Sequence, residues 1–453
     1  MAELVDETTE LLQQLIRNAC VNDGTVQSGH EMRSVDTLQH YLEGSGLDTQ
    51  RYEPEPGRGS LVARIEGSDP DAPSLCLMGH TDVVPVNPDS WDNDPFGGEI
   101  ITSPQGTDEV WGRGAIDMLN LTSSMAVAFK HLANTGYQPR GDLIYFAVAD
   151  EEAGGHHGAE WMLNNEKDVV MADYVLTEMG GFGFNHGDGG RSVLINVAEK
   201  GAGGVRLTVR GTPGHGSMPL EADNALLKAA EVLRRLGAHR PQPQLDDLWV
   251  GLLDALGLEG EMRAALMDPE RVWDTAVALG ELGGKMLHAC SHMSISPNVV
   301  HGGQKLNVIP DAVNIDVDIR TLPGQDSDYV RMELEAAIGD LADQVEITVL
   351  NDRAASRSPH DTPMWDVIES AVHAADPTAR VEPGLIVGGT DARYYRPHGS
   401  VVYGAGIFSP DIDMADFGSR FHGNNERIDL ESLRLVTDFW DRIVRGFDAA
   451  QQP

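Results

Sequence analysis

The sequence has few cysteines, few lysines and no long apolar run, and each shortage argues against a class of protein. Its three cysteines among 453 residues, Cys20, Cys76 and Cys290, are isolated and odd in number. We therefore expect reduced thiols in a cytoplasm rather than a disulfide framework. No run of about 18 apolar residues occurs, so no membrane span is expected. The first residues also lack the pattern of a signal peptide.

Positive charge is scarce as well. The chain has 33 Lys and Arg against 71 Asp and Glu, which gives a formal net charge of −38. Duplex nucleic acid is not expected as a partner, because phosphate binding requires clustered Lys and Arg. We interpret the acidic surface as solvated and self-repelling.

The sequence does contain apolar runs that alternate with helical stretches. Between residues 60 and 180, "LVARI", "SLCLMG", "LIYFAVA" and "DYVLT" are typical of strands, and residues 118–136 of a helix. This alternation predicts an α/β domain with a mainly parallel sheet. Residues 180–192 are predicted to be a Gly-rich turn, without the Gly-Lys-Ser/Thr ending of a phosphate loop.

The pattern changes in the middle of the chain. Strands with strict alternation and two helices follow one another there in the order of a β-α-β-β-α-β (ferredoxin-like) unit. We predict a catalytic domain of residues 1–200 and 350–453, interrupted by an inserted α+β lid domain of residues 201–349. Residues 240–295 form a helical excess, and one hypothesis is that they serve mainly as an assembly surface.

Candidate metal ligands fall where these elements end or begin. In an open parallel sheet the carboxyl ends of the strands form the crevice that binds ligands. Imidazole combined with carboxylate favours zinc, with cobalt or manganese as alternatives. The candidates are His80 and Asp82 after "SLCLMG", Glu151 and Glu152 after "LIYFAVA", Glu178 after "DYVLT", and Asp117 and His422 ahead of helices.

Five of these side chains are candidate ligands, which is more than the three protein ligands of one catalytic zinc. Five ligands suit two metals if one carboxylate bridges the metals. We interpret Asp82 as the acceptor that orients His80. Adjacent residues on an extended chain point in opposite directions, so one of Glu151 and Glu152 can bind metal while its neighbour faces the substrate, where a free carboxylate is the expected general base. The five ligands are His80, Asp117, Glu152, Glu178 and His422.

Seven motifs, in order, resemble the two-zinc aminoacylase/carboxypeptidase family. That family includes glutamate carboxypeptidase, succinyl-diaminopimelate desuccinylase, acetylornithine deacetylase, aminoacylase and carboxypeptidase S. The resemblance implies a zinc-exopeptidase-like catalytic domain that hydrolyses an amide or peptide bond next to a free carboxylate, in N-acyl amino acids or short peptides. The motifs are "GHTDVVPV", "WDNDPFGG", "WGRGAIDM", "ADEEAGG", "GTPGHGSMP", "NVIPDAVNIDVDIR" and "GGTDARY".

The resemblance also implies roles for single residues. Asp117 would bridge two Zn²⁺ ions, with His80 and Glu178 on one and Glu152 and His422 on the other. Glu151 would be the general base, and the peptide after Asp117 would be cis. One departure is Leu119, which stands where the family usually has Lys.

In the lid, His215 matches a histidine that in dimeric members reaches the partner subunit's site and stabilises the oxyanion. The resemblance therefore implies a homodimer through the lid. Asn307, Arg320, Gly389 and Thr390 match residues near the substrate carboxylate, a group that suits the bidentate geometry of Arg.

Two other functions stay open. A two-zinc aminopeptidase would use a similar ligand set but would lack an inserted domain with "GHGSMP". A non-catalytic metal-binding relative would keep the ligands without turnover, and an assay with and without a chelator separates it from an enzyme.

Overall fold

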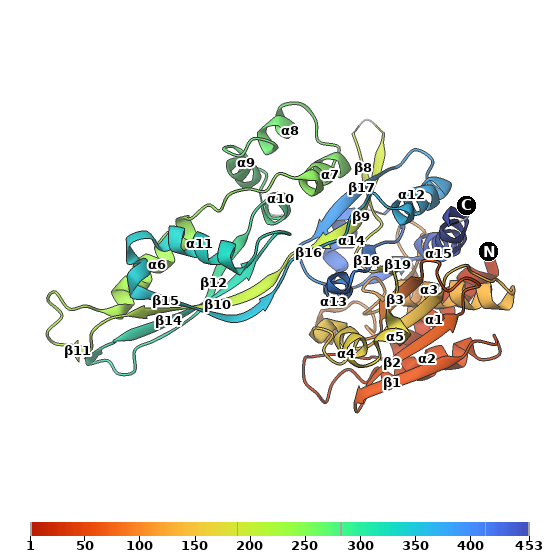
Figure 1. Ribbon diagram of the computed structural model, residues 1–453, viewed down its shortest axis with the longest axis horizontal. Coiled ribbons are helices and arrows are strands. Elements are labelled where there is room, and N and C mark those ends of the chain that lie inside the picture. Colours follow the sequence, from red (N-terminus) through yellow and green to blue (C-terminus); the bar gives the residue numbers. More distant parts are fainter. Residues whose placement is uncertain (1, 188, 281–282, 413, 452–453) are drawn as a thin grey trace.

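The computed structural model describes residues 2–187, 189–280, 283–412 and 414–451. Figure 1 shows an elongated molecule with a large sheet beside both termini and a small sheet at the other end. The chain leaves the large sheet after β9 (Arg191–Glu199) and returns to it at β16 (Ser356–Arg357). The predicted α/β fold with an inserted α+β unit is confirmed.

The large sheet has a parallel centre made of β6, β3, β7 and β18, with antiparallel strands at its flanks. Every residue of β3 and β6 is buried, because helices cover both faces. This explains the continuous apolar runs in the sequence. The strands are β1 (Thr49–Glu55), β2 (Arg58–Ile65), β6 (Leu143–Val148), β3 (Leu75–His80), β7 (Tyr174–Thr177), β18 (Val401–Gly404), β9, β16, and, paired with β9, β17 (Arg380–Ile386) and β8 (Phe182–Asn185).

Two layers of helices cover this sheet and form a hydrophobic core on each face. The last helix begins at a side-chain cap, where Asp429 accepts a hydrogen bond from the Ser432 backbone at 2.8 Å. On the first face lie α1 (Ala2–Arg17), α2 (Met32–Leu42), α3 (Leu119–Asn134), α12 (Pro363–Ala375), α14 (Met414–Arg420) and α15 (Leu430–Ala450), and on the second α4 (Ala159–Asn165), α5 (Lys167–Val170) and α13 (Ala392–Tyr395).

The small sheet has the strand order β12-β14-β10-β15, and α6 and α11 cover one of its faces. Buried and half-buried residues alternate strictly in β14, as a one-sided sheet requires. The limits 201 and 349 stay a prediction for the domain. The elements are β10 (Ala202–Arg210), α6 (Ala225–Ala238), β12 (Ser294–Gly302), β14 (Ala312–Arg320), α11 (Ser327–Ile338) and β15 (Val345–Arg353).

Within the described residues, the helical excess forms four helices between α6 and β12. We call them the helical insertion: α7 (Asp247–Ala255), α8 (Gly260–Leu266), α9 (Val272–Ala278) and α10 (Gly283–Ser291). In Figure 1 they lie above the junction of the two sheets, with α7 next to β8 and β17. Their buried side chains form a separate core that contacts Leu385 and Val387 of the large domain.

The Gly-rich segment is more than the turn that we predicted, because β8 pairs with β9 as a hairpin. The alternation of Phe182 and Phe184 with small residues was the missed signal. No described helix is long and apolar enough to cross a membrane. The remaining elements are β4 (Glu99–Thr102), β5 (Asp108–Trp111), β19 (Arg427–Asp429), β11 (Gly214–His215), β13 (Val308–Ile309) and the 3-10 helices η1 (Pro88–Ser90), η2 (Glu151–Ala153), η3 (Gly339–Gln344) and η4 (Arg396–His398).

Candidate metal centre and active site

The five predicted ligands meet at the carboxyl end of the parallel strands. His80, Asp117 and Glu178 form one group, and Asp117, Glu152 and His422 form another. Within each group the ligand atoms lie within 4.8 Å of one another. Asp117 belongs to both groups, as a bridging carboxylate must.

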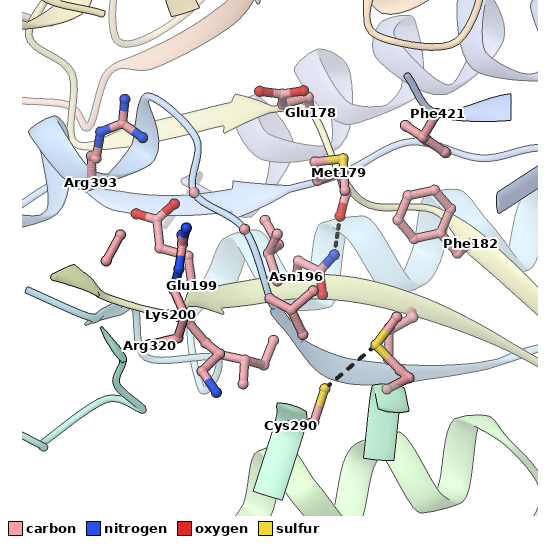
Figure 2. A pocket seen from close by; sticks show the side chains of 18 of the residues that line it. Glu178, Met179, Phe182, Asn196, Glu199, Lys200, Cys290, Arg320, Arg393 and Phe421 are labelled. Carbon is pink, nitrogen blue, oxygen red and sulfur yellow. Dashed lines mark hydrogen bonds between the residues drawn. The ribbon is translucent and has the colours of Figure 1, made fainter. Parts of the chain in front are cut away.

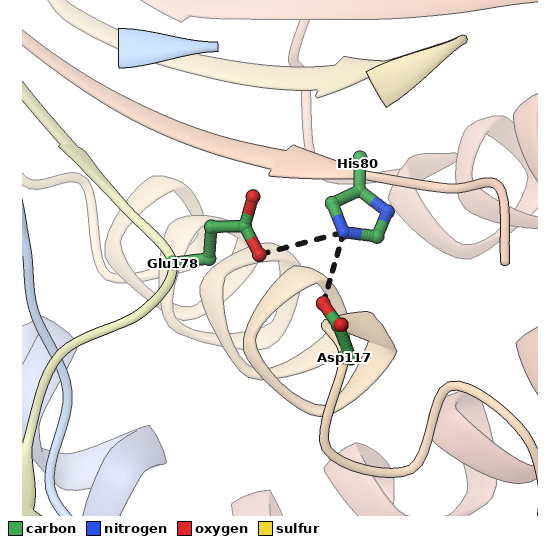
Figure 3. A group of neighbouring side chains, drawn as sticks. All are labelled: His80, Asp117 and Glu178. Carbon is green, nitrogen blue, oxygen red and sulfur yellow. Dashed lines mark hydrogen bonds and ion pairs between the residues drawn. The ribbon is translucent and has the colours of Figure 1, made fainter. Parts of the chain in front are cut away.

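In the first group, the imidazole of His80 faces two carboxylates (Figure 3). Its Nε2 lies 3.3 Å from Asp117 Oδ1 and 3.6 Å from Glu178 Oε2. Its Nδ1 lies 2.9 Å from the main-chain oxygen of Asp82, which can only accept. The neutral ring therefore carries its proton on Nδ1 and presents the Nε2 lone pair, as a metal ligand does.

In the second group, His422 faces the other oxygen of Asp117. Its Nε2 lies 3.2 Å from Asp117 Oδ2 and 3.4 Å from Glu152 Oε2. Two atoms bound to one tetrahedral zinc at about 2.0–2.1 Å lie about 3.3 Å apart, close to these separations. The buried Oε1 of Glu152 has no hydrogen-bond partner among the described residues. The donor set thus fits two zinc ions.

The centre concentrates buried negative charge. Burial lowers the pKa of His80, but Glu178 and Asp117 outweigh it and hold that pKa well above its usual value. Burial raises the pKa of Glu178 to about 8, and it raises the pKa of Glu152 as well. Hydrogen bonds with Asp117 and Glu152 raise the pKa of His422 to about 10. A divalent cation would offset the repulsion among these carboxylates.

The backbone at the centre is strained. Asp150, Met179 and His422 have φ values of 69°, 64° and 52°. Each of these residues is a predicted ligand or adjoins a predicted ligand or base. A left-handed conformation costs a residue with a side chain about 1–3 kcal/mol, so the surrounding structure must hold it in place. The peptide between Asp117 and Met118 is cis, as the resemblance implied.

Glu151 and Glu152 lie together in a tight turn. Both lie in η2, directly after Asp150, so the premise of an extended chain at this point is wrong. Glu152 belongs to the second ligand group, and Glu151 lines the adjoining cavity. Burial, and then the charge of Glu178, raise the pKa of Glu151 well above its usual value, as suits a base that works near neutral pH.

Asp82 supports both His80 and this turn. Its carboxylate accepts hydrogen bonds from the backbone of Glu151 at 3.3 Å and of Glu152 at 3.1 Å. Its Oδ1 lies 3.6 Å from His80 Nδ1, farther than the main-chain oxygen. Asp82 thus orients His80 mainly through its main chain, and its carboxylate holds the turn.

Three supporting residues escaped the sequence analysis. Glu426 accepts a hydrogen bond from the Asp117 backbone at 3.1 Å and pairs with Arg113 at 2.6 Å. Asn22 donates to Asp82 at 2.9 Å. Glu426 and Arg113 are charged residues within a few positions of a candidate ligand, and this signal could have revealed them. Asn22 is far from every motif.

A cavity of 890 Å³ adjoins the metal centre. Arg320 and Gly389 line it as predicted substrate contacts. Arg320 is paired with Asp318 at 2.8 Å. The backbone nitrogen of Thr390 donates to Glu199 at 2.7 Å, and its hydroxyl also bonds that carboxylate, so Thr390 supports the wall from behind.

Arg393 is a cavity residue that we did not predict, although it stands in "GGTDARY". Its Nε and Nη2 atoms are buried and have no hydrogen-bond partner among the described residues. Burial lowers its pKa, but Asp391 and Glu151 outweigh it and raise that pKa. The guanidinium is thus a cation with free donors beside the metal centre.

His215 and Asn307 lie far from the metal centre of their own chain. Both are exposed in the β11–β13 region, which Figure 1 places at the end away from the large sheet. The backbone N–H of Ser217 donates to His215 Nδ1 at 3.1 Å. The neutral ring therefore carries its proton on Nε2, as a free donor.

The family of the chain follows from comparison with known proteins. The sequence model of peptidase family M20/M25/M40 matches residues 76–446. The chain belongs to this family. This M20 chain is 25% identical to the N-fatty-acyl-amino acid synthase/hydrolase PM20D1 of Xenopus tropicalis, over 100% of the chain and 89% of that protein. It is 26% identical to aminoacylase-1 of Mus musculus, over 96% of the chain and 93% of that protein.

The fold of the M20 chain is also that of solved M20 enzymes. An M20 family metallo-carboxypeptidase from Sulfolobus solfataricus superposes with a TM-score of 0.67 at 18% identity, covering 98% of this chain and 100% of that chain. The resemblance drawn from the seven motifs is confirmed. The M20 chain is a peptidase or amidohydrolase of a metal-dependent family and carries a cluster of residues that can bind metal.

Proposed function

We propose that this M20 protein is a dinuclear zinc hydrolase that cleaves an amide or peptide bond next to a free carboxylate. The proposal rests on Asp117, whose two oxygens face the imidazoles of His80 and His422 in two separate ligand groups. When bound, the two ions would polarise the scissile carbonyl and lower the pKa of a water molecule. Cobalt or manganese would suit the same donors.

Glu151 is the proposed proton carrier. It shares the cavity wall with Asp117 and Glu152, so it faces the place where water would attack. Its carboxylate would accept the proton of the attacking water and deliver it to the nitrogen of the leaving amine. The raised pKa of Glu151 favours holding this proton between the two transfers.

The cations of the cavity suit a substrate carboxylate. Arg393 has unpaired donors, whereas Arg320 already pairs with Asp318, so we assign the larger share of carboxylate binding to Arg393. The Gly389 backbone lies beside them. N-acyl amino acids and short peptides are the proposed substrates. The names of the relatives, an N-fatty-acyl-amino acid synthase/hydrolase and an aminoacylase, support the first class.

A homodimer through the inserted unit is part of this proposal. His215 and Asn307 of a second copy would reach the site, where the free Nε2–H of His215 would stabilise the oxyanion. The strand β12 is an edge of the small sheet, and the inserted unit exposes apolar side chains on α6, on β12 and in or beside β13. They include Leu226, Leu227, Val299, Val300, Leu306 and Val308.

The alternatives fit the site less well. An aminopeptidase must bind a free amine, whereas Arg320 and Arg393 border this cavity with positive charge. A non-catalytic relative would have no use for Glu151 beside a complete ligand set. The cytoplasmic location stays a prediction.

Metal analysis combined with activity tests the proposal. We expect two zinc ions per chain and hydrolysis of N-acyl amino acids, but no hydrolysis of the matching N-acyl amino acid amides, which lack the free carboxylate. A chelator should abolish turnover, and zinc, cobalt or manganese should restore it. Turnover that persists in chelator, or fully folded active protein without stoichiometric metal, would contradict the proposal.

A further inference from the structure

One side of the cavity beside the metal centre is made by the helical insertion. Five side chains of the insertion line the same cavity as the candidate metal ligands. They are Leu252 in α7, Leu256 directly after α7, and Met286, Leu287 and Cys290 in α10. All five are apolar. Figure 2 shows Cys290 across the pocket from Glu178, so the insertion faces the metal centre.

Charge and apolar surface are separated within this cavity. In Figure 2 Arg393, Lys200 and Arg320 lie on one side, and Phe182 and Phe421 on the other. The two phenylalanine rings pack edge to face, with their centroids 5.9 Å apart. A substrate with one carboxylate therefore has an anchor on one side and an apolar chamber on the other.

The insertion is fastened to the large domain. Lys200, the residue after β9, donates from Nζ to the carbonyls of Ala289 and His292, at 2.7 Å each, at the end of α10. His186 of the β8–β9 hairpin donates to the carbonyl of Ala255 at 3.1 Å, at the end of α7. These bonds hold the apolar wall in register with the metal centre.

We propose that the helical insertion is the acyl-specificity element of this protein and that the chamber accepts a bulky apolar acyl group, aliphatic or aromatic. This inference rests on the proposed function and deepens it. The carboxylate meets the cations, the scissile carbonyl meets the metal centre, and the acyl group extends along α7 and α10. Each methylene buried there favours binding roughly fourfold, so three or four of them give about a hundredfold.

The test uses the full-length, zinc-loaded protein and two substrate series. In one series the amino acid is constant and the acyl group grows from acetyl to dodecanoyl. In the other the acyl group stays acetyl and the amino acid side chain grows. We expect kcat/KM to rise about a hundredfold along the first series and much less along the second. A flat first series, or a dependence on the amino acid alone, overturns the inference and leaves the proposed function standing.

Matched variants locate the effect. Met286→Gln and Leu256→Asn keep the size of the side chain but place a polar group in the chamber, and we expect each to lower the ratio of kcat/KM for dodecanoyl to acetyl substrates about tenfold. Met262→Gln on α8 lies outside the cavity, with 38% of Met262 exposed, and should leave the ratio unchanged. Equal ratios in all three variants would refute the assignment.

Binding distinguishes this inference from the proposed function. If no N-acyl amino acid is hydrolysed after metal is restored, the proposed function fails. Calorimetry with dodecanoate and acetate then tests the chamber by itself. The chamber is supported if dodecanoate binds about a hundredfold more tightly than acetate and if the Met286→Gln variant binds dodecanoate more weakly than the unchanged protein does. Undetectable dodecanoate binding, or a deletion of the insertion that alters only the oligomeric state, overturns it.

Discussion

The metal centre and the tip of the inserted unit carry equally clear motifs, but the chain uses them differently. At the centre, ligands from distant segments are brought together, and Asp117 contacts both His80 and His422. At the tip, His215 and Asn307 are exposed, and their segments pair with each other through the bond from the Gly216 N–H to the Asn307 carbonyl. The comparison teaches that a motif can identify candidate residues without showing whether one chain brings them together.

The largest expected effect comes from removing the carboxylate shared by the two ligand groups. Asp117→Asn keeps the shape but weakens both metal positions, so we expect loss of metal and a fall in kcat of about a thousandfold or more, since several kcal/mol of charge stabilisation are lost. Metal content and turnover are the measurements. The control is Asp71→Asn at an exposed turn, which should change neither. Full activity of Asp117→Asn would end the dinuclear interpretation.

The next prediction distinguishes the roles of two neighbouring carboxylates, Glu151 and Glu152. Glu151→Gln removes the proposed base, and we expect kcat to fall by about 10²–10⁴ with the metal content unchanged. Glu152→Gln should lower the metal content as well, because Glu152 faces His422 at 3.4 Å. Mass spectrometry and steady-state kinetics check both variants. If Glu151→Gln lost metal and Glu152→Gln did not, the two roles would be reversed.

A third prediction concerns the tip. His215→Ala should lower kcat by about 10²–10³, the usual cost of one oxyanion donor, although His215 lies far from its own metal centre. Mixing His215→Ala with Glu151→Gln should restore activity, because one site of the mixed dimer then has both groups intact. Activity is measured before and after subunit exchange. Absence of rescue in a verified mixed dimer would place His215 outside the partner's site.

The smallest expected effect is a change in KM, and it differs between two arginines of the cavity. Arg393→Lys should raise KM about 10- to 100-fold, since a hydrogen bond to a charged group contributes about 1.5–3 kcal/mol. Arg320→Lys should raise it less, because Arg320 already pairs with Asp318. Kinetics on one N-acyl amino acid gives both values. If Arg320→Lys raised KM more than Arg393→Lys did, Arg320 would be the main contact for the substrate carboxylate.

Much of the fold could be predicted because its signals are local. The continuous apolar run of β3 is typical of a sheet that is covered on both faces, and the alternation of β14 is typical of a sheet that is covered on one face. The turn at Glu151 and Glu152 could not be predicted in this way. It depends on the positive φ of Asp150 and on the hydrogen bonds that the Glu151 and Glu152 backbone donates to the distant Asp82, which periodicity does not record.

The supporting residues show the same limit. Glu426 lies close to His422 in the chain and could have been suspected, but Asn22 acts on Asp82 across a long stretch of sequence. Arg393 was within a recognised motif, yet only its buried Nε and Nη2, which lack a hydrogen-bond partner among the described residues, single it out from Arg320.

By itself the sequence determined the α/β character, the inserted unit and the set of candidate metal ligands, because strand periodicity and motif spacing are properties of short segments. Only the tertiary structure decided that Asp117 lies between two imidazoles, that His215 is far from its own centre, and that the helical insertion faces the active site. These facts depend on contacts between segments far apart in the chain, and packing of the whole molecule sets such contacts.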